Sequence, residues 1–459
     1  MKPNVLLLHC HDLGDHLGCY GDASATTPNI DRLAEQSVRF ERYFAASPTC
    51  SPSRGAMLTG LMPHRNGLMA LASGGHWEVN PNVATLPALL QQVGYATACF
   101  GTWHISAEFW DRGIEIGHQD AGLERATADA IDYLEDPPAD RPFFLMVGVG
   151  KPHLPWETPG PDPEDVRLPG YLAEAPEPSA VREELSRFYG EVQRMDQAMG
   201  RIIAALEAHD LDGDTLVIFT SDHGIGMPLA KGTLYDPGVK IPLIIRRPGA
   251  TSDGRRYAGL TSNVDLLPTV LEAVGAEDLI PNDVDGQSLW PIVEGAGTVA
   301  RDHVFTEQTW HDFYEPIRAV RTDRYKLIRN FEPGPGLQVA ADILQTRTTG
   351  VMRERLRAWP RPEIELYDLQ NDPWERENLA EDRAFRRIRN ELEALLDAWL
   401  VETKDPILDG VVPAPPGYWE HFCAKSVGPG RLPPAEGRDA WVTVRWPPGA
   451  TEHRCVADK

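Results

Sequence analysis

A short cysteine segment carries the residues best suited to chemistry. It reads C-S-P-S-R from Cys50 to Arg54, and Thr59-Gly60 follow five and six residues after the arginine. Pro52 and the serine after it favour a helix start, so Cys50 would lie at or just before a helix N-terminus. Free N–H groups and the helix dipole stabilise an anion there. We therefore expect an activated nucleophile at Cys50, with Arg54 holding anionic oxygens; a buried structural cysteine is the plainer alternative.

Two polar pairs follow two apolar runs and suggest a metal site. His11-Asp12 come after the run at 4–9, and Asp222-His223 come after the run at 215–220. One such aspartate alone could equally be a helix cap or a turn residue. Two pairs at strand ends can converge on one cation, because the carboxyl ends of parallel strands meet at one edge of a sheet.

The order of apolar runs and amphipathic segments predicts the fold class. Strands and helices alternate over about 300 residues, which favours a parallel-rich sheet covered on both faces. We predict an α/β fold with a large mixed, mostly parallel sheet between helices. The expected strands are 4–9, 95–100, 142–149, 215–220 and 241–246, and the expected helices are 28–34, 85–93, 125–135, 179–209 and 265–274.

The pattern changes near residue 300. Short alternating runs at 317–321, 325–329 and 365–369 predict a small antiparallel sheet, and 382–402 predicts the helix behind it. We therefore divide the chain into a catalytic α/β domain at 1–300, a small α+β subdomain at 301–404 and a Pro/Gly-rich tail at 405–459. The tail is expected to wrap the body, with a strand at 440–446.

Composition limits the partners. The net charge is −24 over 459 residues, which argues against nucleic acid or an anionic membrane surface as a partner. No apolar run reaches the length of a membrane span, and the N-terminal run is too short for a signal sequence, so we expect a cytoplasmic protein. The cysteines lack CxxC spacing and are expected to be reduced, apart from one with a special role: Cys10, Cys19, Cys50, Cys99, Cys423 and Cys455.

The segment from Cys50 to Gly60 resembles the signature of the sulfatases of the alkaline phosphatase superfamily. The resemblance implies an alkaline phosphatase-like fold and oxidation of Cys50 to formylglycine by a formylglycine-generating enzyme. It also implies one divalent cation, Ca²⁺ or Mg²⁺ by family. A histidine at position 11 replaces the first aspartate of the family's tandem pair, and such softer ligands favour Mn²⁺ or Zn²⁺. The implied metal residues are His11, Asp12, Cys50, Asp222 and His223.

Three further segments resemble family elements and imply catalytic roles. Gly101 to His104 resembles the family's G-K-W-H element, which implies that His104 contacts the formylglycine hydroxyl. K-P-H-L-P at 151–155 resembles an element whose histidine, His153 here, faces the scissile bond. K-G-T-L-Y-D at 231–236 resembles an element whose lysine, Lys231 here, binds the sulfate. The implied reaction is attack of a formylglycine hydroxyl on sulfur. Arg54 and Lys231 would stabilise the oxygens, and His153 would protonate the leaving atom.

One departure puts a sulfate contact in doubt. The family's lysine in G-K-W-H is Thr102 here, which supplies no charge. We expect His9, Lys151 or Arg65 to be candidates for replacing it.

Several stretches resemble the heparan N-sulfatase subgroup and its bacterial relatives. They are 50–71 with His64, Asn66 and Gly67, E-L-Y-D-L through N-L-A at 365–380, and T-K-D-P at 403–406. The resemblance implies a sulfate ester or sulfamate on a small sulfated carbohydrate. The predicted substrate-binding residues are Lys151, Thr102 and His64.

Two other functions remain open from the sequence, and a homo-oligomer is possible as well. One is a phosphonate monoester or phosphodiester hydrolase of the same superfamily, which shares the nucleophile motif. The other is a catalytically impaired, anion-binding relative, for which His11 and Thr102 are the only support.

Overall fold

A central eight-stranded sheet organises the chain. The computed structural model describes residues 2–72, 77–119, 122–297, 301–312 and 314–416. The strand order is β4-β3-β5-β1-β6-β7-β2-β8, and every neighbouring pair is parallel except the two that involve β7. The strands are β1 (Asn4–Cys10), β2 (Val38–Phe44), β3 (Ala96–Gly101), β4 (Ile116–Gln119), β5 (Phe143–Gly148), β6 (Thr215–Ser221), β7 (Lys240–Arg246) and β8 (Arg256–Ser262).

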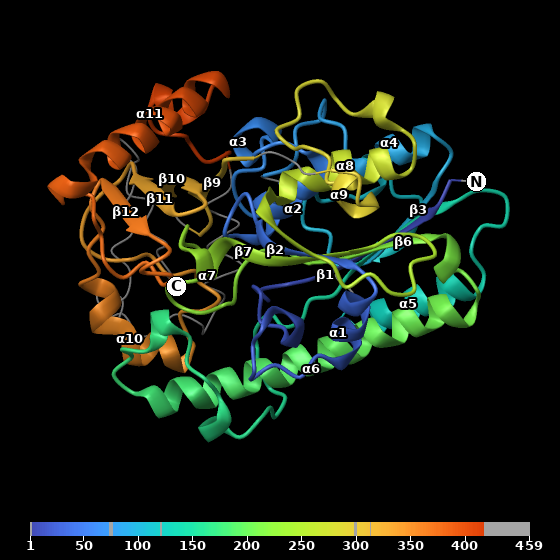
Figure 1. Ribbon diagram of the computed structural model, residues 1–459, viewed down its shortest axis with the longest axis horizontal. Helices are drawn as coiled ribbons and strands as arrows, with labels where there is room; N and C mark the ends of the chain where they lie inside the picture. Colours follow the sequence, from blue (N-terminus) through green and yellow to red (C-terminus); the bar gives the residue numbers. More distant parts are fainter. Residues whose placement is uncertain (1, 73–76, 120–121, 298–300, 313, 417–459) are drawn as a thin grey trace, which may run out of the picture.

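Helices cover both faces of this sheet (Figure 1). One face carries α2, α4, α8 and α9, and the other carries α1, α5 and the long α6. The bounds are α1 (Pro28–Glu35), α2 (Cys50–Thr59), α3 (Pro63–Asn66), α4 (Leu86–Gln92), α5 (Leu123–Glu135), α6 (Pro178–Ala208), α7 (Asp236–Val239), α8 (Leu266–Ala273) and α9 (Trp290–Glu294).

Alternation along the central strand creates two cores. Val5 and Leu7 point into the core beneath α2, α4 and α8, whereas Leu6 and Leu8 point into the core beneath α1, α5 and α6. All four side chains are fully buried. A strand covered on both faces must be apolar on both, which explains the continuous V-L-L-L run.

A four-stranded antiparallel sheet, in the order β12-β11-β10-β9, lies beside the carboxyl edge of the large sheet (Figure 1). Its N–H groups reach the large domain directly: Glu307 N donates to Ala46 O and Trp310 N to Met69 O. Its elements are β9 (His303–Trp310), β10 (Tyr314–Thr322), β11 (Tyr325–Asn330), α10 (Arg347–Arg357), β12 (Ile364–Asp368) and α11 (Arg386–Glu402).

The predicted fold class is confirmed, with omissions. The strands β2, β4, β8 and β9 and the helices α3, α7, α9 and α10 were not predicted. Strand β2 reads V-R-F-E-R-Y-F, and its charged residues hide a strand that is buried through its apolar positions. The predicted helix at 382–402 begins later, at Arg386, after a short 3-10 turn.

Three expectations from the sequence are not tested by the structure. The domain boundaries stay a prediction, and the tail strand at 440–446 lies outside the described residues, as do Cys423 and Cys455. The four described cysteines are free thiols: Cys10, Cys19, Cys50 and Cys99. Among the described residues, no helix has the length and apolarity needed to cross a bilayer.

Candidate active site

Helix α2 begins at Cys50, and its whole length is buried. Thr49 is the N-cap residue in extended conformation, and its side chain makes no capping hydrogen bond. The N–H groups of Cys50 and Ser51 therefore receive no cap from the Thr49 side chain and can face an anion. Pro52 has no N–H, and Ser53 N donates to Thr49 O. Two contacts lock the helix to the sheet: Ser53 donates to the Asp222 carbonyl, and Asn263 Nδ2 donates to Ser53 O at 2.9 Å.

The predicted site segments converge because their strands are neighbours. Strands β3, β5, β1 and β6 are adjacent in the sheet, and each ends at the same edge. Two residues just beyond these strands hold left-handed backbone, Asp12 with φ 59° and His104 with φ 60°. Such strain in residues other than glycine concentrates at functional sites.

A cluster of nitrogen and oxygen ligands lies beside Cys50. His11 Nε2 lies 3.3 Å from both Asp12 Oδ1 and Asp222 Oδ2, and His223 Nε2 lies 3.1 Å from Asp12 Oδ1. Ligand atoms of His11, Cys50, Asp222 and His223 all lie within 4.8 Å of one another. The structure thus brings all five predicted metal residues together.

Burial and charge set the protonation of this cluster. Burial lowers the pKa of His11 to about 4, despite the nearby Asp222 carboxylate. For His223 burial acts in the same direction, but Asp222 and Asp12 outweigh it and raise the pKa to about 10. Burial alone would raise the pKa of Asp12, yet Lys231 and the neighbouring histidines hold that pKa well below its usual range.

Arg54 lies at the centre of the site. Its side chain is fully buried, and Nε and Nη2 donate to Asp222 Oδ2 at 3.1 and 2.8 Å. Its Nη1 donates to the Thr102 carbonyl at 3.0 Å. Asp222 also accepts from the backbone N–H groups of Asp12 and His223, so one carboxylate organises both strand ends.

The opposite wall of the site is formed by Lys231, His153 and Asp342. Lys231 Nζ donates to Asp12 Oδ2 at 2.8 Å and to Asp342 Oδ2 at 2.5 Å. His153 Nε2 lies 3.1 Å from the same Asp342 oxygen, and its Nδ1 lies 2.7 Å from the Leu154 carbonyl. Burial acts to lower the pKa of His153, but the Asp12 carboxylate and the bond to Asp342 raise it.

The polar side chains around Cys50 stabilise the thiolate form of its side chain, with Lys231 and His311 as cations among them. Burial would raise the pKa of the Cys50 thiol, but His11, Lys231 and a hydrogen bond with His104 hold that pKa well below its ordinary value. His311 also interacts with Cys50; burial opposes its protonation, but Asp312, whose Oδ2 is 2.8 Å away, raises its pKa to about 10. A buried thiolate among cations is the arrangement that activates a nucleophile.

Two residues of this site were missed from the sequence. Asp342 lies in the loop between β11 and α10, and His311 follows β9, so both come from the second sheet and its connections. Neither residue belongs to a local sequence motif. Their place in the site depends on how the second sheet packs against the first domain, which the sequence does not show.

Two predicted substrate-binding residues do not join the group around Cys50. Lys151 Nζ donates to the Pro155 carbonyl at 2.7 Å and lies 3.4 Å from Glu191 Oε2. His64 is 1 % exposed at its side chain and pairs with Glu307 at 2.6 Å. Thr102 does lie at the site, where its backbone carbonyl accepts a hydrogen bond from Arg54.

The three candidates for replacing the missing lysine differ in charge and in partner. Burial, and then the charge of Arg54, lower the pKa of His9 well below its ordinary value, so this ring is neutral. Lys151 is bound to Glu191, and Arg65 pairs with Asp285 at 2.6 Å. Of the residues described, His311 is instead a charged side chain beside Cys50.

His64 belongs to a buried charge network that joins the two sheets. Glu307 accepts from His64, while Arg318 donates to Asp405 at 2.6 Å and lies 3.9 Å from Glu307. All four groups are buried. Two sequence stretches that resembled one subgroup, around His64 and around Asp405, therefore meet in one structural network.

The family is established by comparison of sequences. The Sulfatase family model matches residues 3–276, and the model for the N-sulphoglucosamine sulphohydrolase C-terminal region matches residues 227–335. The chain belongs to the sulfatase family, and it is a sulfuric ester hydrolase.

One relative agrees with this family, and two solved structures at 22% identity show the shared fold. Human N-sulphoglucosamine sulphohydrolase is 30% identical over 89% of this chain and 92% of its own length. A solved structure in complex with its substrate D-glucosamine-2-N,6-O-disulfate has a TM-score of 0.70 and 22% identity, covering 89% of this chain and 100% of the other. Phosphonate monoester hydrolase of Agrobacterium radiobacter has a TM-score of 0.69 and 22% identity over 89% and 97%, which shows the shared fold alone.

Proposed function

We propose that this sulfatase hydrolyses a sulfate ester or sulfamate on a small sugar, with formylglycine made from Cys50 as nucleophile. One observation carries the proposal: Cys50 begins a buried helix, between a cluster of metal-ligand side chains and the Lys231–His153 pair. That arrangement sets a nucleophile, a cation site and a proton donor around one point.

The donor set beside Cys50 is suited to one divalent cation. His11 Nε2, Asp12 Oδ1 and His223 Nε2 are buried and make no hydrogen bond of regular geometry within the described residues. Orphaned buried ligand atoms of this kind are expected where an ion completes the site. With Asp222 and position 50, they would hold a cation that polarises the sulfate and the nucleophile. Two imidazoles favour Mn²⁺ or Zn²⁺ over the family's Ca²⁺.

The side chains of this chain divide the remaining work. The hydrated form of formylglycine is a gem-diol. One of its hydroxyls attacks sulfur as the bond from sulfur to the leaving atom breaks, and loss of the second hydroxyl's proton then reforms the aldehyde and releases sulfate. Arg54 and Lys231 bind the sulfate oxygens, and both are preorganised by carboxylate partners. His153 donates a proton from Nε2 to the leaving atom, because its Nδ1 faces the Leu154 carbonyl. His104 takes the proton of the second hydroxyl at position 50.

The substrate and partner assignments rest on relatives. Curated relatives include an N-sulphoglucosamine sulphohydrolase and an N-acetylglucosamine-6-O-sulfatase, so a sulfated amino sugar is the first class to test. A formylglycine-generating enzyme is the required partner for maturation. The cytoplasmic location stays a prediction.

A phosphonate monoester or phosphodiester hydrolase is the second candidate. Thr102 in place of lysine and the additional histidine ligand at position 11 favour it, because they change the anion and metal contacts. A catalytically impaired relative has the same support and is opposed by the intact group of Arg54, His104, His153 and Lys231.

The first experiment tests maturation. Protein produced in its own host is digested with trypsin, and the mass of the peptide Tyr43–Arg54 is measured with and without an oxime-forming reagent. We expect a peptide with an aldehyde in place of the thiol, and Cys50→Ala provides the peptide that cannot react. An unmodified thiol in soluble, metal-loaded protein would contradict the formylglycine mechanism.

The second experiment separates the candidate functions. One phenol is presented as its sulfate and as its phosphonate monoester, and kcat/KM is compared alongside glucosamine N-sulfate and N-acetylglucosamine 6-sulfate. A sulfatase prefers the sulfates by orders of magnitude. A preference for the phosphonate would establish the alternative.

A further inference from the structure

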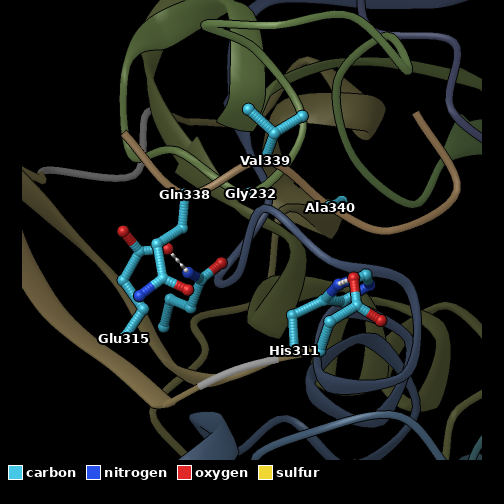
Figure 2. Close-up of a pocket in the computed structure, with 8 residues that line it drawn as sticks. Gly232, His311, Glu315, Gln338, Val339 and Ala340 are labelled. Atoms are coloured by element: carbon cyan, nitrogen blue, oxygen red, sulfur yellow. Dashed lines mark hydrogen bonds and ion pairs between the residues drawn. The ribbon is translucent and has the colours of Figure 1, made fainter. Parts of the chain in front are cut away.

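A small cavity beside Lys231 and His311 is lined by three amide atoms that have no hydrogen-bond partner among the described residues, Gln308 Oε1 and both amide atoms of Gln338. It lies between Gly232, which follows Lys231, and His311, which interacts with Cys50. Figure 2 shows Glu315 and Gln338 at one end of this cavity and His311 at the other. Its volume is about 10 Å³, which is room for one water-sized group.

The polar atoms facing this cavity are unsatisfied. Gln308 is 3% exposed, and its Oε1 is buried without a hydrogen bond among the described residues. The same holds for both amide atoms of Gln338. Leaving such atoms unpaired costs about 1–3 kcal/mol each, so they indicate a group that binds there.

The orientation of the Gln308 amide is fixed by its neighbours. Gln308 Nε2 donates to Glu315 Oε2 at 3.1 Å, and the other oxygen of Glu315 accepts from Arg361. The donor end therefore faces Glu315. A Cβ placed on Gly232 would lie 4.0 Å from Gln308 Oε1, so the acceptor end points toward Lys231-Gly232. Gln308 Oε1 is therefore a preorganised acceptor beside the Lys231-Gly232 segment.

We propose that this cavity binds one hydroxyl group of the sugar that leaves after desulfation. The hydroxyl donates to Gln308 Oε1 and accepts from Gln338 Nε2, so it gives a partner to one unpaired atom of each amide. The proposal rests on the proposed sulfatase function and adds the residues that read the sugar.

The charges around the cavity restrict what fills it. Asp312 and Glu315 line it, and their cationic partners His311 and Arg361 already pair with them. A second sulfate would meet two carboxylates and no unpaired cation among the lining residues. The hydroxyl is therefore favoured, and a sugar with another sulfate at this position is excluded.

The test compares a sugar sulfate with a substrate that has no sugar hydroxyl. The best sugar substrate among glucosamine N-sulfate, glucosamine 6-sulfate and N-acetylglucosamine 6-sulfate is assayed beside 4-nitrophenyl sulfate, for Gln308→Leu and Gln338→Leu. The exposed Gln92→Leu at the end of α4 is the matched control. We expect kcat/KM for the sugar to fall about 10- to 100-fold in both variants, with the aryl sulfate and the control unchanged.

Other outcomes overturn the proposal. Equal losses on both substrates would mean that the amides support the catalytic geometry, and unchanged values on both would mean that the cavity holds a structural water only. If Gln308→Leu does not fold, the proposal is tested on Gln338→Leu, whose substitution lies in a loop. An unchanged inhibition constant for inorganic sulfate would show that the sulfate site of that variant is intact. In wild type, removing the hydroxyl from the sugar sulfate should lower kcat/KM relative to the aryl sulfate. In the glutamine variants the same removal should have no further effect, because the contact to that hydroxyl is already lost. Failure of wild-type protein on every sulfate would instead refute the proposed function.

Discussion

Asp342 lies where an anionic substrate must bind, and its removal should strengthen sulfate binding. Its Oδ2 lies 2.5 Å from Lys231 Nζ and 3.1 Å from His153 Nε2, the two groups assigned to sulfate and leaving atom. A sulfate oxygen that accepts from Lys231 must displace this carboxylate or lie beside it. Asp342→Asn keeps the shape and removes the charge.

The magnitude follows from charge separation. Two unit charges about 4 Å apart interact by about 4 kcal/mol at an effective dielectric constant near 20. Asp342 is 27% exposed, so solvent screening reduces the repulsion, and we take about 1.5 kcal/mol as the net value. That corresponds to about tenfold tighter sulfate binding.

The same variant should also move the pH profile. His153 must be protonated to donate, and Asp342 is one of the groups that raises its pKa. Without that charge the pKa of His153 falls, so the alkaline limb of kcat/KM moves to lower pH. The inhibition constant of inorganic sulfate and kcat/KM from pH 5 to 9 measure both effects. Asp397→Asn on the exposed face of α11 is the control.

Weaker sulfate binding in Asp342→Asn would refute the reasoning, because it would mean that the carboxylate aligns Lys231 and does not compete with substrate. If the alkaline limb of kcat/KM stayed at the same pH, His153 would not be the proton donor.

Three further predictions concern charge and metal. The network around His64 should stabilise the fold at low pH. Burial acts to lower the pKa of His64, but Glu307 raises it, so the stabilisation is complete below about pH 6.5 and is lost as the pH rises through the higher pKa of the folded state. The free energy of unfolding from urea denaturation should therefore be larger at pH 6 than at pH 9, and His64→Gln should abolish this difference. Asp405→Asn leaves Arg318 partly unpaired and should cost about 3 kcal/mol of unfolding free energy, measured in the same way; no change would remove the network from the stability of the fold. His11→Asp supplies a harder ligand and should raise activity with Ca²⁺ relative to Mn²⁺ after chelation and reloading, whereas an unchanged ratio would mean that position 11 is not a ligand.

The strands of the large sheet could be predicted where their apolar run is continuous, but not where charged residues interrupt the run or where the strand is very short. Strands β1, β3, β5 and β6 are apolar on both faces and stand out in the sequence. Strand β2 was missed because Arg39 and Arg42 interrupt it; Arg39 pairs with Glu41 and Arg42 with Asp323, so these charges are accommodated without breaking the strand. Strand β4 has four residues, fewer than a pattern can establish.

The candidate site was predictable in its local motifs and not in its distant contributions. Cys50 begins α2, His104 and His223 follow the ends of β3 and β6, and strand order brings them together. Asp342 and His311 come from the second sheet and its loops, and their place depends on docking between sheets. His64 shows the opposite error, since a motif resemblance suggested substrate contact whereas the fold uses the ring to join the two sheets.

The two departures from the family pattern compensate each other in charge. Exchanging an aspartate for His11 removes one negative charge, because burial lowers the pKa of His11 to about 4 and keeps the ring neutral near pH 7. Exchanging a lysine for Thr102 removes one positive charge. The formal charge facing a sulfate is therefore unchanged, and Arg54, which bonds the Thr102 carbonyl, holds the anion-binding geometry. His311 then adds a cation from the second sheet. This balance favours an altered but working site over an impaired one, since random loss would not be expected to preserve both geometry and charge.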